Sequence, residues 1–273
     1  MTFSSDFLLT AAAVLAMLAA SATHAAIAET AEEKGLAVAT EMDRRDIGWG
    51  DSEVALEMIL GNRQGVTSTR ELRIRSLEVA DADRGDKSLI IFDRPRDING
   101  TALLSHTHIL DADDQWLYLP ALKRVKRISS ANKSGPFVGS ELAYEDLLSQ
   151  EVAKYTYKWL RDEACPGAET IKCFVVERYP QYEKSGYTKQ IVWIDEEEYR
   201  LMRIDYYDRK ESRLKTMTLT DYRKYSRAYW RAHVWDVVNH QTGKTTQLAF
   251  GEYRFGVGLN DNAFTSSRLK RVR

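Results

Sequence analysis

Between residues 67 and 255, short apolar segments with a period of two alternate with turn residues along most of the chain. In the first segment Leu72 and Ile74 alternate with charged residues, and the phase then shifts to Leu77, which predicts a bulge near Ser76. The links are of hairpin length, so the sequence predicts an antiparallel sheet. A flat sheet of this width would expose long edges and an apolar face, so it must curl or be covered. The expected strands, about eleven, are 67–79, 88–92, 102–110, 116–119, 125–128, 174–178, 190–194, 201–207, 215–222, 229–238 and 245–255.

Helices are expected mainly in front of this sheet. The segment 31–45 can form an amphipathic helix. A second helix is expected over 51–61, because Val54, Met58 and Ile59 recur at i, i+4 and i+5 between a polar capping residue and a glycine stop. Both helices are short, so they need a larger surface on which to lie.

The segment 134–148 interrupts the strand pattern. Gly135 and Pro136 break the alternation, and Ser140 is placed to cap a short helix that follows it. This segment is therefore expected to be an ordered insertion that lies across the sheet.

The first residues of the chain resemble an export signal. Phe7 to Ala22 is apolar and uncharged, which is shorter than the roughly 20 residues of a spanning helix. Small residues follow at 26–28 as an A-x-A site, which predicts cleavage before Glu29. The expected organisation is a signal peptide over 1–28 and a single domain over 29–273, located in the periplasm.

Charge and cysteine content narrow the class of protein. The chain has 39 basic and 40 acidic residues, and this balance argues against a nucleic-acid binder, which normally has a basic excess. The two cysteines, Cys165 and Cys173, flank Pro166 and Gly167 between strand-like segments, which predicts a disulfide that staples a hairpin. A reactive thiol pair is the alternative, although the spacing is not C-x-x-C.

The residues that could perform chemistry do not form a recognisable catalytic or metal site. His106 and His108 share a strand face, but no third ligand stands at a diagnostic spacing. Ser140 lacks the G-x-S-x-G context of a nucleophile elbow. Glu145 and Asp146 are adjacent, so on a helix their side chains would point about 100° apart. We therefore expect no enzyme activity, no metal and no cofactor.

A basic segment is a candidate for docking to a partner or a membrane. It contains Lys123, Arg124, Lys126 and Arg127, and acidic residues follow it along the chain. Such a patch could orient the protein on an acidic partner or on anionic lipid headgroups, whereas the simpler interpretation is a solvated hairpin. Lys133 ends this basic run. At the C-terminal end of the chain, a second basic site is formed by Arg268, Lys270, Arg271 and Arg273.

Several segments carry a resemblance to a known family. Residues 116–128 (WLYLPALKRVKRI), 135–140 (GPFVGS) and 144–146 (YED), with 193–195 (WID) and 262–265 (NAFT), resemble LolA-like outer-membrane lipoprotein-sorting proteins. The resemblance implies an unclosed β-barrel of about eleven antiparallel strands, with helices on its concave side and a hydrophobic cavity between them. It also implies a transporter partner in the inner membrane, of the RND/MMPL-like or ABC type, and transient contact with a membrane.

The function predicted on this basis is a periplasmic carrier that binds the acyl chains of lipids or lipoproteins and shuttles them between an inner-membrane transporter and the outer membrane. Aromatic and aliphatic side chains suit a cavity that holds flexible alkyl chains without specific hydrogen bonds. A lipid or lipoprotein sensor on the same scaffold is the alternative, and a secreted hydrolase is a weaker one. The candidate cavity or cover residues are Met58, Trp116, Phe137, Leu142, Tyr144 and Trp193.

Overall fold

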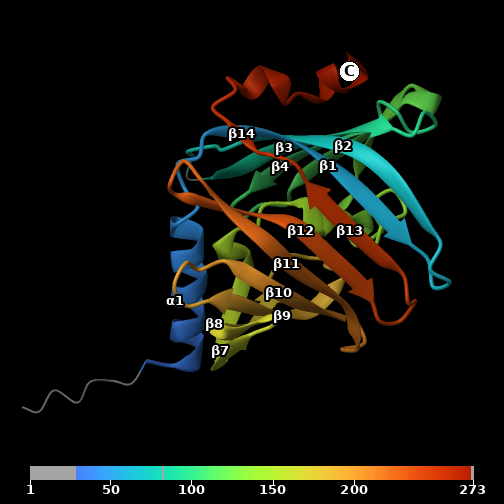
Figure 1. Cartoon of the computed structure of the whole chain (residues 1–273). Helices are drawn as coiled ribbons and strands as arrows, with labels where there is room; N and C mark the ends of the chain where they lie inside the picture. The colour runs from blue at the N-terminus through green and yellow to red at the C-terminus, as the bar shows by residue number, and fades with distance from the viewer. Residues whose placement is uncertain (1–28, 82, 272–273) are drawn as a thin grey trace, which may run out of the picture.

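Fourteen strands form one antiparallel sheet that curls around an apolar interior (Figure 1). The computed structural model describes residues 29–81 and 83–271. Along the sheet the order is β6-β5-β4-β3-β2-β1-β13-β12-β11-β10-β9-β8-β7, and β14 pairs with β1. The strands are β1 (Asp51–Gly61), β2 (Thr67–Leu77), β3 (Arg84–Arg94), β4 (Ala102–His108), β5 (Asp114–Leu119), β6 (Arg124–Ile128), β7 (Tyr155–Cys165), β8 (Ala168–Pro180), β9 (Tyr187–Asp195), β10 (Leu201–Asp208), β11 (Arg213–Tyr225), β12 (Tyr229–Asn239), β13 (Thr245–Phe250) and β14 (Arg254–Phe255).

The barrel is unclosed, as the sequence predicts. Its two end strands, β6 and β7, follow each other in the chain but occupy opposite edges of the sheet. The segment 129–154 joins them and therefore runs across the opening between the two edges. No pairing between β6 and β7 occurs within the residues described, so the sheet is a half-barrel with an insertion at its seam.

Side-chain alternation divides the apolar residues into an inner and an outer set. In β9, Val192 and Ile194 join the large inner cluster, while Trp193 lies in an outer cluster beside the disulfide. In β3, Phe92 faces inward and Ile91 faces a second outer cluster. Successive side chains of a strand point to opposite faces, so one strand contributes to both clusters.

The segment 51–61 is a strand, so the helix predicted there is wrong. Ser52, Val54, Leu56 and Met58 are all buried, which is a period of two. Pairing with both β2 and β13 satisfies the backbone of β1 from either side. The match at i, i+4 was coincidental, and the glycine interpreted as a helix stop instead ends β1 before the turn to β2.

Two further strand expectations need correction. β2 pairs with β1 in continuous register, and its irregularity against β3 lies at Glu71–Leu72 rather than near Ser76. Leu77 simply faces the outer cluster, which explains the apparent change of phase. The expected eleven strands become fourteen because β1 and β7 are added and the segment 245–255 divides into β13 and β14.

The helix α1 (Ala31–Arg44) confirms the helix predicted at this place. Its N-terminus has a capping box in which Thr30 and Glu33 exchange hydrogen bonds. The helix packs closely on β7, since a Cβ on Gly35 would lie 2.8 Å from the backbone nitrogen of Trp159. Figure 1 shows α1 beside β7 and β8, at the open side of the sheet. Neither α1 nor any other helix in the described ranges has the length and hydropathy needed to cross a membrane.

The insertion 129–154 is ordered and lies in the barrel interior. Phe137 and Leu142 are both fully buried in the inner cluster. Ser140 does not cap a helix: its hydroxyl donates to the Phe137 carbonyl at 2.8 Å and accepts from the Leu142 N–H at 3.3 Å, which closes a turn. The helical residues that follow form only one 3₁₀ turn. The short 3₁₀ helices of the chain are η1 (Pro120–Leu122), η2 (Ser130–Asn132), η3 (Tyr144–Leu147), η4 (Val152–Lys154), η5 (Asp261–Ala263) and η6 (Ser266–Arg271).

The predicted disulfide is confirmed. Cys165 ends β7, Cys173 lies in β8, and their Cα atoms are 5.0 Å apart. Gly167 forms the turn between the strands with a φ of 76°, a conformation that glycine adopts without strain. The bridge is buried in an outer cluster with Val175 and Trp193.

Candidate functional site

A cavity of about 760 Å³ opens at one end of the half-barrel. Its walls come from the C-terminal half of α1, the loop 45–50, the β2–β3 and β4–β5 turns, the insertion and strands β7–β12. This volume is within the range of ordinary small-ligand sites. This cavity is the candidate functional site.

The inner wall of the cavity is apolar. Val176, Val192 and Ile194 project from the concave face of the sheet and belong to the inner cluster. Ala39 and Met42 face them from α1. Burial of a flexible hydrocarbon against such a wall contributes about 0.8 kcal/mol for each methylene group, without any directional contact.

Carboxyl groups line one side of the cavity opening. Burial raises the pKa of Asp86 to about 6, and neighbouring carboxylates add to the effect. Burial also raises the pKa of Glu151 to about 7, with the Asp86 charge as the next cause. Burial raises the pKa of Asp43 and of Asp46 as well, although the guanidinium of Arg231 opposes the shift at Asp46. These acids therefore form a partly desolvated group that is easily protonated.

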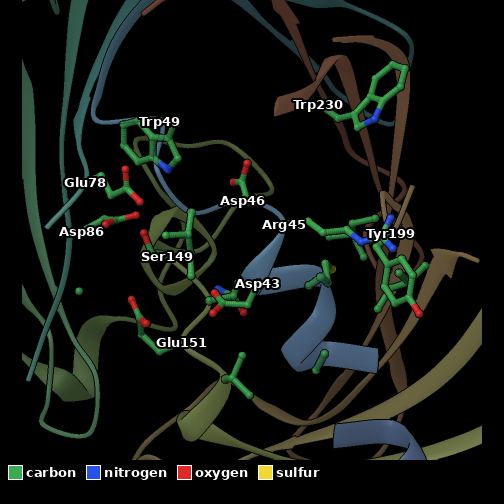
Figure 2. A pocket seen from close by; sticks show the side chains of 18 of the residues that line it. Asp43, Arg45, Asp46, Trp49, Glu78, Asp86, Ser149, Glu151, Tyr199 and Trp230 are labelled. Atoms are coloured by element: carbon green, nitrogen blue, oxygen red, sulfur yellow. The ribbon is translucent and has the colours of Figure 1, made fainter. Parts of the chain in front are cut away.

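Aromatic and basic side chains form the other side of the opening. Figure 2 shows Glu78, Asp86 and Glu151 on one side of the cavity and Arg45, Tyr199 and Trp230 on the other. The Arg45 guanidinium lies 4.2 Å from the centre of the Tyr199 ring. Such stacking leaves broad, flat surfaces beside the opening that suit apolar as well as polar groups.

A second, smaller cavity of about 130 Å³ adjoins the large one and shares Gln150, Arg178 and Leu201 with it. Its other walls combine apolar and aromatic residues, including Tyr206 and Trp235, with the polar side chains of Glu145, Asp146 and Gln190. Arg178 is only 3% exposed, so a buried cation stands at the junction of the two cavities.

Buried polar contacts fix the insertion beside these cavities. The Asp146 carboxylate pairs with Lys215 of β11 at 2.5 Å and accepts a hydrogen bond from Tyr187 at 2.8 Å. The Glu145 carboxylate accepts from the Gly186 N–H and the Ser185 hydroxyl, both at 2.8 Å, while burial raises its pKa. The insertion is thus bonded to the far half of the sheet and is a fixed part of the interior.

The six predicted cavity or cover residues do not lie together. Met58, Phe137 and Leu142 are completely or almost completely buried in the inner cluster, and Tyr144 packs against it. The side chains of the two tryptophans point to the outer face of the sheet, because their neighbours along each strand point inward. Trp116 and Trp193 belong to two different outer clusters. None of the six lines either cavity.

The predicted basic patch lies at the β5–β6 turn. Lys123, Arg124 and Lys126 are exposed, and no carboxylate among residues 29–81 and 83–271 lies within ion-pair distance of them. Arg127 pairs with Asp114. Lys133 does not belong to this surface, because it is buried and donates to the Asp113 carbonyl at 2.7 Å.

The C-terminal basic residues approach the same part of the sheet. The helix η6 packs against β4, β5 and β6, and its Leu269 is buried in an outer cluster. Arg268, Lys270 and Arg271 therefore flank the β5–β6 hairpin, and Arg273 lies outside the described residues.

The ring nitrogens of His106 and His108, which were considered as metal ligands, lie beside protein oxygens. The Nε2 atom of His106 lies 2.8 Å from the Phe264 carbonyl, and that of His108 lies 3.2 Å from Asp114. Across the ranges that the structure describes, no three His, Cys, Asp or Glu side chains are arranged to hold a metal ion.

Comparison with known proteins identifies the family. A crystal structure of an outer membrane lipoprotein-sorting protein domain from Vibrio parahaemolyticus is 55% identical, with a TM-score of 0.84, and the match covers 88% of this chain and 100% of that one. The chain belongs to this outer membrane lipoprotein-sorting family. A crystal structure of a DUF1329 family protein from Desulfovibrio piger has the same fold. It is 31% identical, with a TM-score of 0.81, and the match covers 88% of this chain and 99% of that one.

More distant comparisons agree on the fold. A LolA superfamily protein from Nitrosomonas europaea is 16% identical with a TM-score of 0.67, over 85% of this chain and 98% of that one. A family model described as "Uncharacterized protein" matches residues 84–271. No curated protein sequence matches the chain significantly. The predicted LolA-like fold of the lipoprotein-sorting family is therefore confirmed.

Sequence reasoning missed the residues that form the cavity. Arg178 and Val192 lie in strands that were predicted, but their positions relative to one another depend on how far the sheet curls. Asp43, Asp86 and Glu151 are far apart in the sequence and form no motif. An available signal was the excess of acidic residues in the β2–β3 and β4–β5 turns.

Proposed function

We propose that this member of the lipoprotein-sorting family is a non-enzymatic carrier that binds the acyl chain of a lipid or lipoprotein in the 760 Å³ cavity. The single observation that supports the proposal best is the apolar wall that α1 and the concave face of the sheet form together. Burial of a long chain there supplies affinity through many weak contacts. Delivery from an inner-membrane transporter of the RND/MMPL-like or ABC type, and transfer to the outer membrane, belong to the same proposal.

The periplasm is the proposed location. A disulfide between Cys165 and Cys173 persists in an oxidising compartment and is rare in the cytosol. The predicted signal peptide, residues 1–28, lies outside the described residues. Intact-mass measurement of the periplasmic protein tests both parts: the expected product begins at Glu29 and has no free thiol.

Displacement of a fluorescent fatty acid from delipidated protein tests acyl binding. Met42 lines the cavity, whereas Leu36 on the same helix is 47% exposed and does not line it. Met42→Glu should weaken binding at least about tenfold, because the charge loses hydration when the chain covers it. Leu36→Glu is the matched control and should bind as the wild type does. Absence of saturable binding by folded wild-type protein would contradict the proposal.

The β5–β6 turn is proposed as the surface that docks on an anionic membrane. Leu122 at its tip is 62% exposed, and Lys123, Arg124 and Lys126 surround it. An exposed aliphatic side chain among cations fits a bilayer interface with anionic headgroups. This turn lies at the opposite end of β5 from the β4–β5 turn, where Ile109 lines the cavity.

A further inference from the structure

Arg178 is a buried cation that forms no ion pair among the residues described, although the Glu145 and Asp146 carboxylates line the same small cavity and are held by other partners. Its side chain is 3% exposed, and no carboxylate in the described ranges lies within ion-pair distance of it. The Nε atom donates to the Gln190 side chain at 2.7 Å, and the guanidinium lies 4.9 Å from the centre of the Tyr155 ring. A neutral amide and an aromatic face compensate only part of the cost of burying a charge.

The free end of Arg178 borders the two cavities. The side chain lines both of them. Within residues 29–81 and 83–271, Nη1 and Nη2 have no hydrogen-bond partner, yet neither is fully enclosed by protein atoms. Two parallel N–H donors of a guanidinium match the two oxygens of a carboxylate or of a phosphate. The geometry points to an anionic group of the ligand as the partner of Arg178, bound inside the cavity rather than at its opening.

The room on either side of Arg178 fixes the direction of the ligand. The cavity beyond it, of about 130 Å³, is too small for a long hydrocarbon chain, whereas the 760 Å³ cavity is not. With the anionic group at Arg178, the chain therefore extends along Val176, Val192 and Ile194 toward the opening. This orientation requires a small headgroup, so the cargo class is a single-chain anionic lipid, either a fatty acid or a phosphate monoester. The inference rests on the acyl-binding function proposed above.

Three ligands with the same chain test the headgroup. Hexadecanoate, hexadecyl phosphate and hexadecan-1-ol would be measured against delipidated full-length protein by displacement of a fluorescent probe. Wild-type protein should bind at least one of the two anions on the order of ten- to a hundredfold more tightly than the alcohol, because the hydrogen bonds involve charged groups. A preference for one anion identifies the carboxylate or the phosphate as the natural headgroup.

Arg178→Met removes the charge and keeps much of the side-chain volume. This variant should bind the acids and the alcohol equally, while its affinity for the alcohol stays within about threefold of the wild type. Arg161→Met is the control, since Arg161 is exposed, pairs only with Glu163 and lines neither cavity. It should keep the full preference for the anion.

Thermal unfolding separates a binding role from a structural one. If Arg178 serves the ligand, Arg178→Met should leave the melting temperature of the delipidated protein unchanged or raise it, because a buried charge is replaced by an apolar side chain. A clear fall in the melting temperature would assign Arg178 to the fold and overturn the inference. Equal binding of acid and alcohol by the wild type would overturn it too but leave acyl binding intact, whereas binding of none of the three ligands would overturn both.

Discussion

At the scale of single residues, buried charges decide how firmly the insertion is held. The pair Asp146–Lys215 is nearly inaccessible, with side chains 2% and 3% exposed. Lys215 also donates to the Glu141 carbonyl at 2.8 Å, so one ammonium group ties two parts of the insertion to β11. Such a pair adds specificity of position more than net stability, but loss of one partner leaves a buried charge alone.

Lys215→Met should therefore destabilise the protein by about 3–5 kcal/mol, because Asp146 would stay buried without its cation. Urea denaturation measures this free energy. Lys210→Met is the control, since Lys210 is exposed at the β10–β11 turn and forms no ion pair among the residues described. A loss below about 1 kcal/mol for the Lys215 variant would show that water reaches Asp146 and replaces the pair.

The carboxyl groups at the cavity opening predict a dependence of stability on pH. Burial raises the pKa of Asp86 from 3.8 to about 6 and that of Glu151 from 4.5 to about 7. Between about pH 4 and pH 7 the folded state then binds more protons than the unfolded state, so these two groups make stability fall as pH rises through this window.

Glu151→Gln is neutral at every pH and should remove part of this slope, so the variant should gain stability over the wild type at pH 8 and show no gain at pH 4. Denaturation in urea at several pH values checks the result. Glu183→Gln changes an exposed carboxylate and serves as the control. Parallel pH profiles for wild type and Glu151→Gln would show that the carboxyl at 151 is hydrated in the folded protein.

At the scale of elements, the β7–β8 hairpin is an edge unit that carries part of the cavity wall. β7 pairs only with β8 within the sheet, and its other side is covered by α1 through the close approach at Gly35. The Cys165–Cys173 bridge closes a short loop at the end of this hairpin. An edge hairpin has few neighbouring strands to hold it in place. The bridge therefore stabilises it mainly by reducing the number of conformations open to the unfolded chain, and less by adding contacts to the folded state.

Replacement of both cysteines by alanine should cost about 2–3 kcal/mol, as expected for closure of a loop of this length. The free energy of unfolding of this variant, compared with that of the oxidised wild type, checks the value. Reduction of the wild type by dithiothreitol should give the same loss, and this agreement controls for the effect of the substitutions themselves. No change after reduction would mean that the hairpin is held by its packing on Trp193 and Met202 alone.

At the scale of the whole molecule, the half-barrel has two chemically different ends. Antiparallel strands place the β2–β3 and β4–β5 turns at the cavity end and the β5–β6 turn at the other. Acidic residues dominate the first two turns and basic residues the third. The proposed docking of the β5–β6 end on an anionic membrane would therefore turn the cavity opening away from that surface.

Joint neutralisation of Lys123, Arg124 and Lys126 to glutamine should weaken binding to vesicles that contain phosphatidylglycerol by about a hundredfold, since each basic residue near the surface contributes about fivefold. Co-sedimentation at low salt measures this, and binding of the wild type should itself fall as salt rises. The matched single variants Lys126→Gln and Lys172→Gln compare an exposed lysine on β6, within the basic patch, with one on β8. Equal binding by all variants would show that the β5–β6 hairpin is simply solvated and does not dock on the membrane.

The fold and the site differ in how far the sequence predicts them. Most strands and α1 were predicted, because period-two alternation and the helical spacing of apolar residues are local properties of the chain. Two strands were missed. β7 was not among the predicted strands, and 51–61 was predicted as a helix because the spacing of Val54 and Met58 fits a helix and a strand equally until pairing on both sides decides. No such local signal marks Arg178, which looks in the sequence like any charged residue of a strand.

The sequence by itself determined that a wide antiparallel sheet forms, that its hairpin at Cys165–Cys173 is bridged, and that 134–148 lies across it. The tertiary structure alone decided where the cavity lies and which side chains line it. The curl of the sheet brings Asp86, Glu151 and Arg178 together at one cavity, although more than sixty positions of the sequence separate Asp86 from Glu151. Curvature and seam position arise from the sum of all strand pairings and from the packing of the insertion. The sequence of any one segment therefore does not predict the curvature of the sheet or the position of the seam.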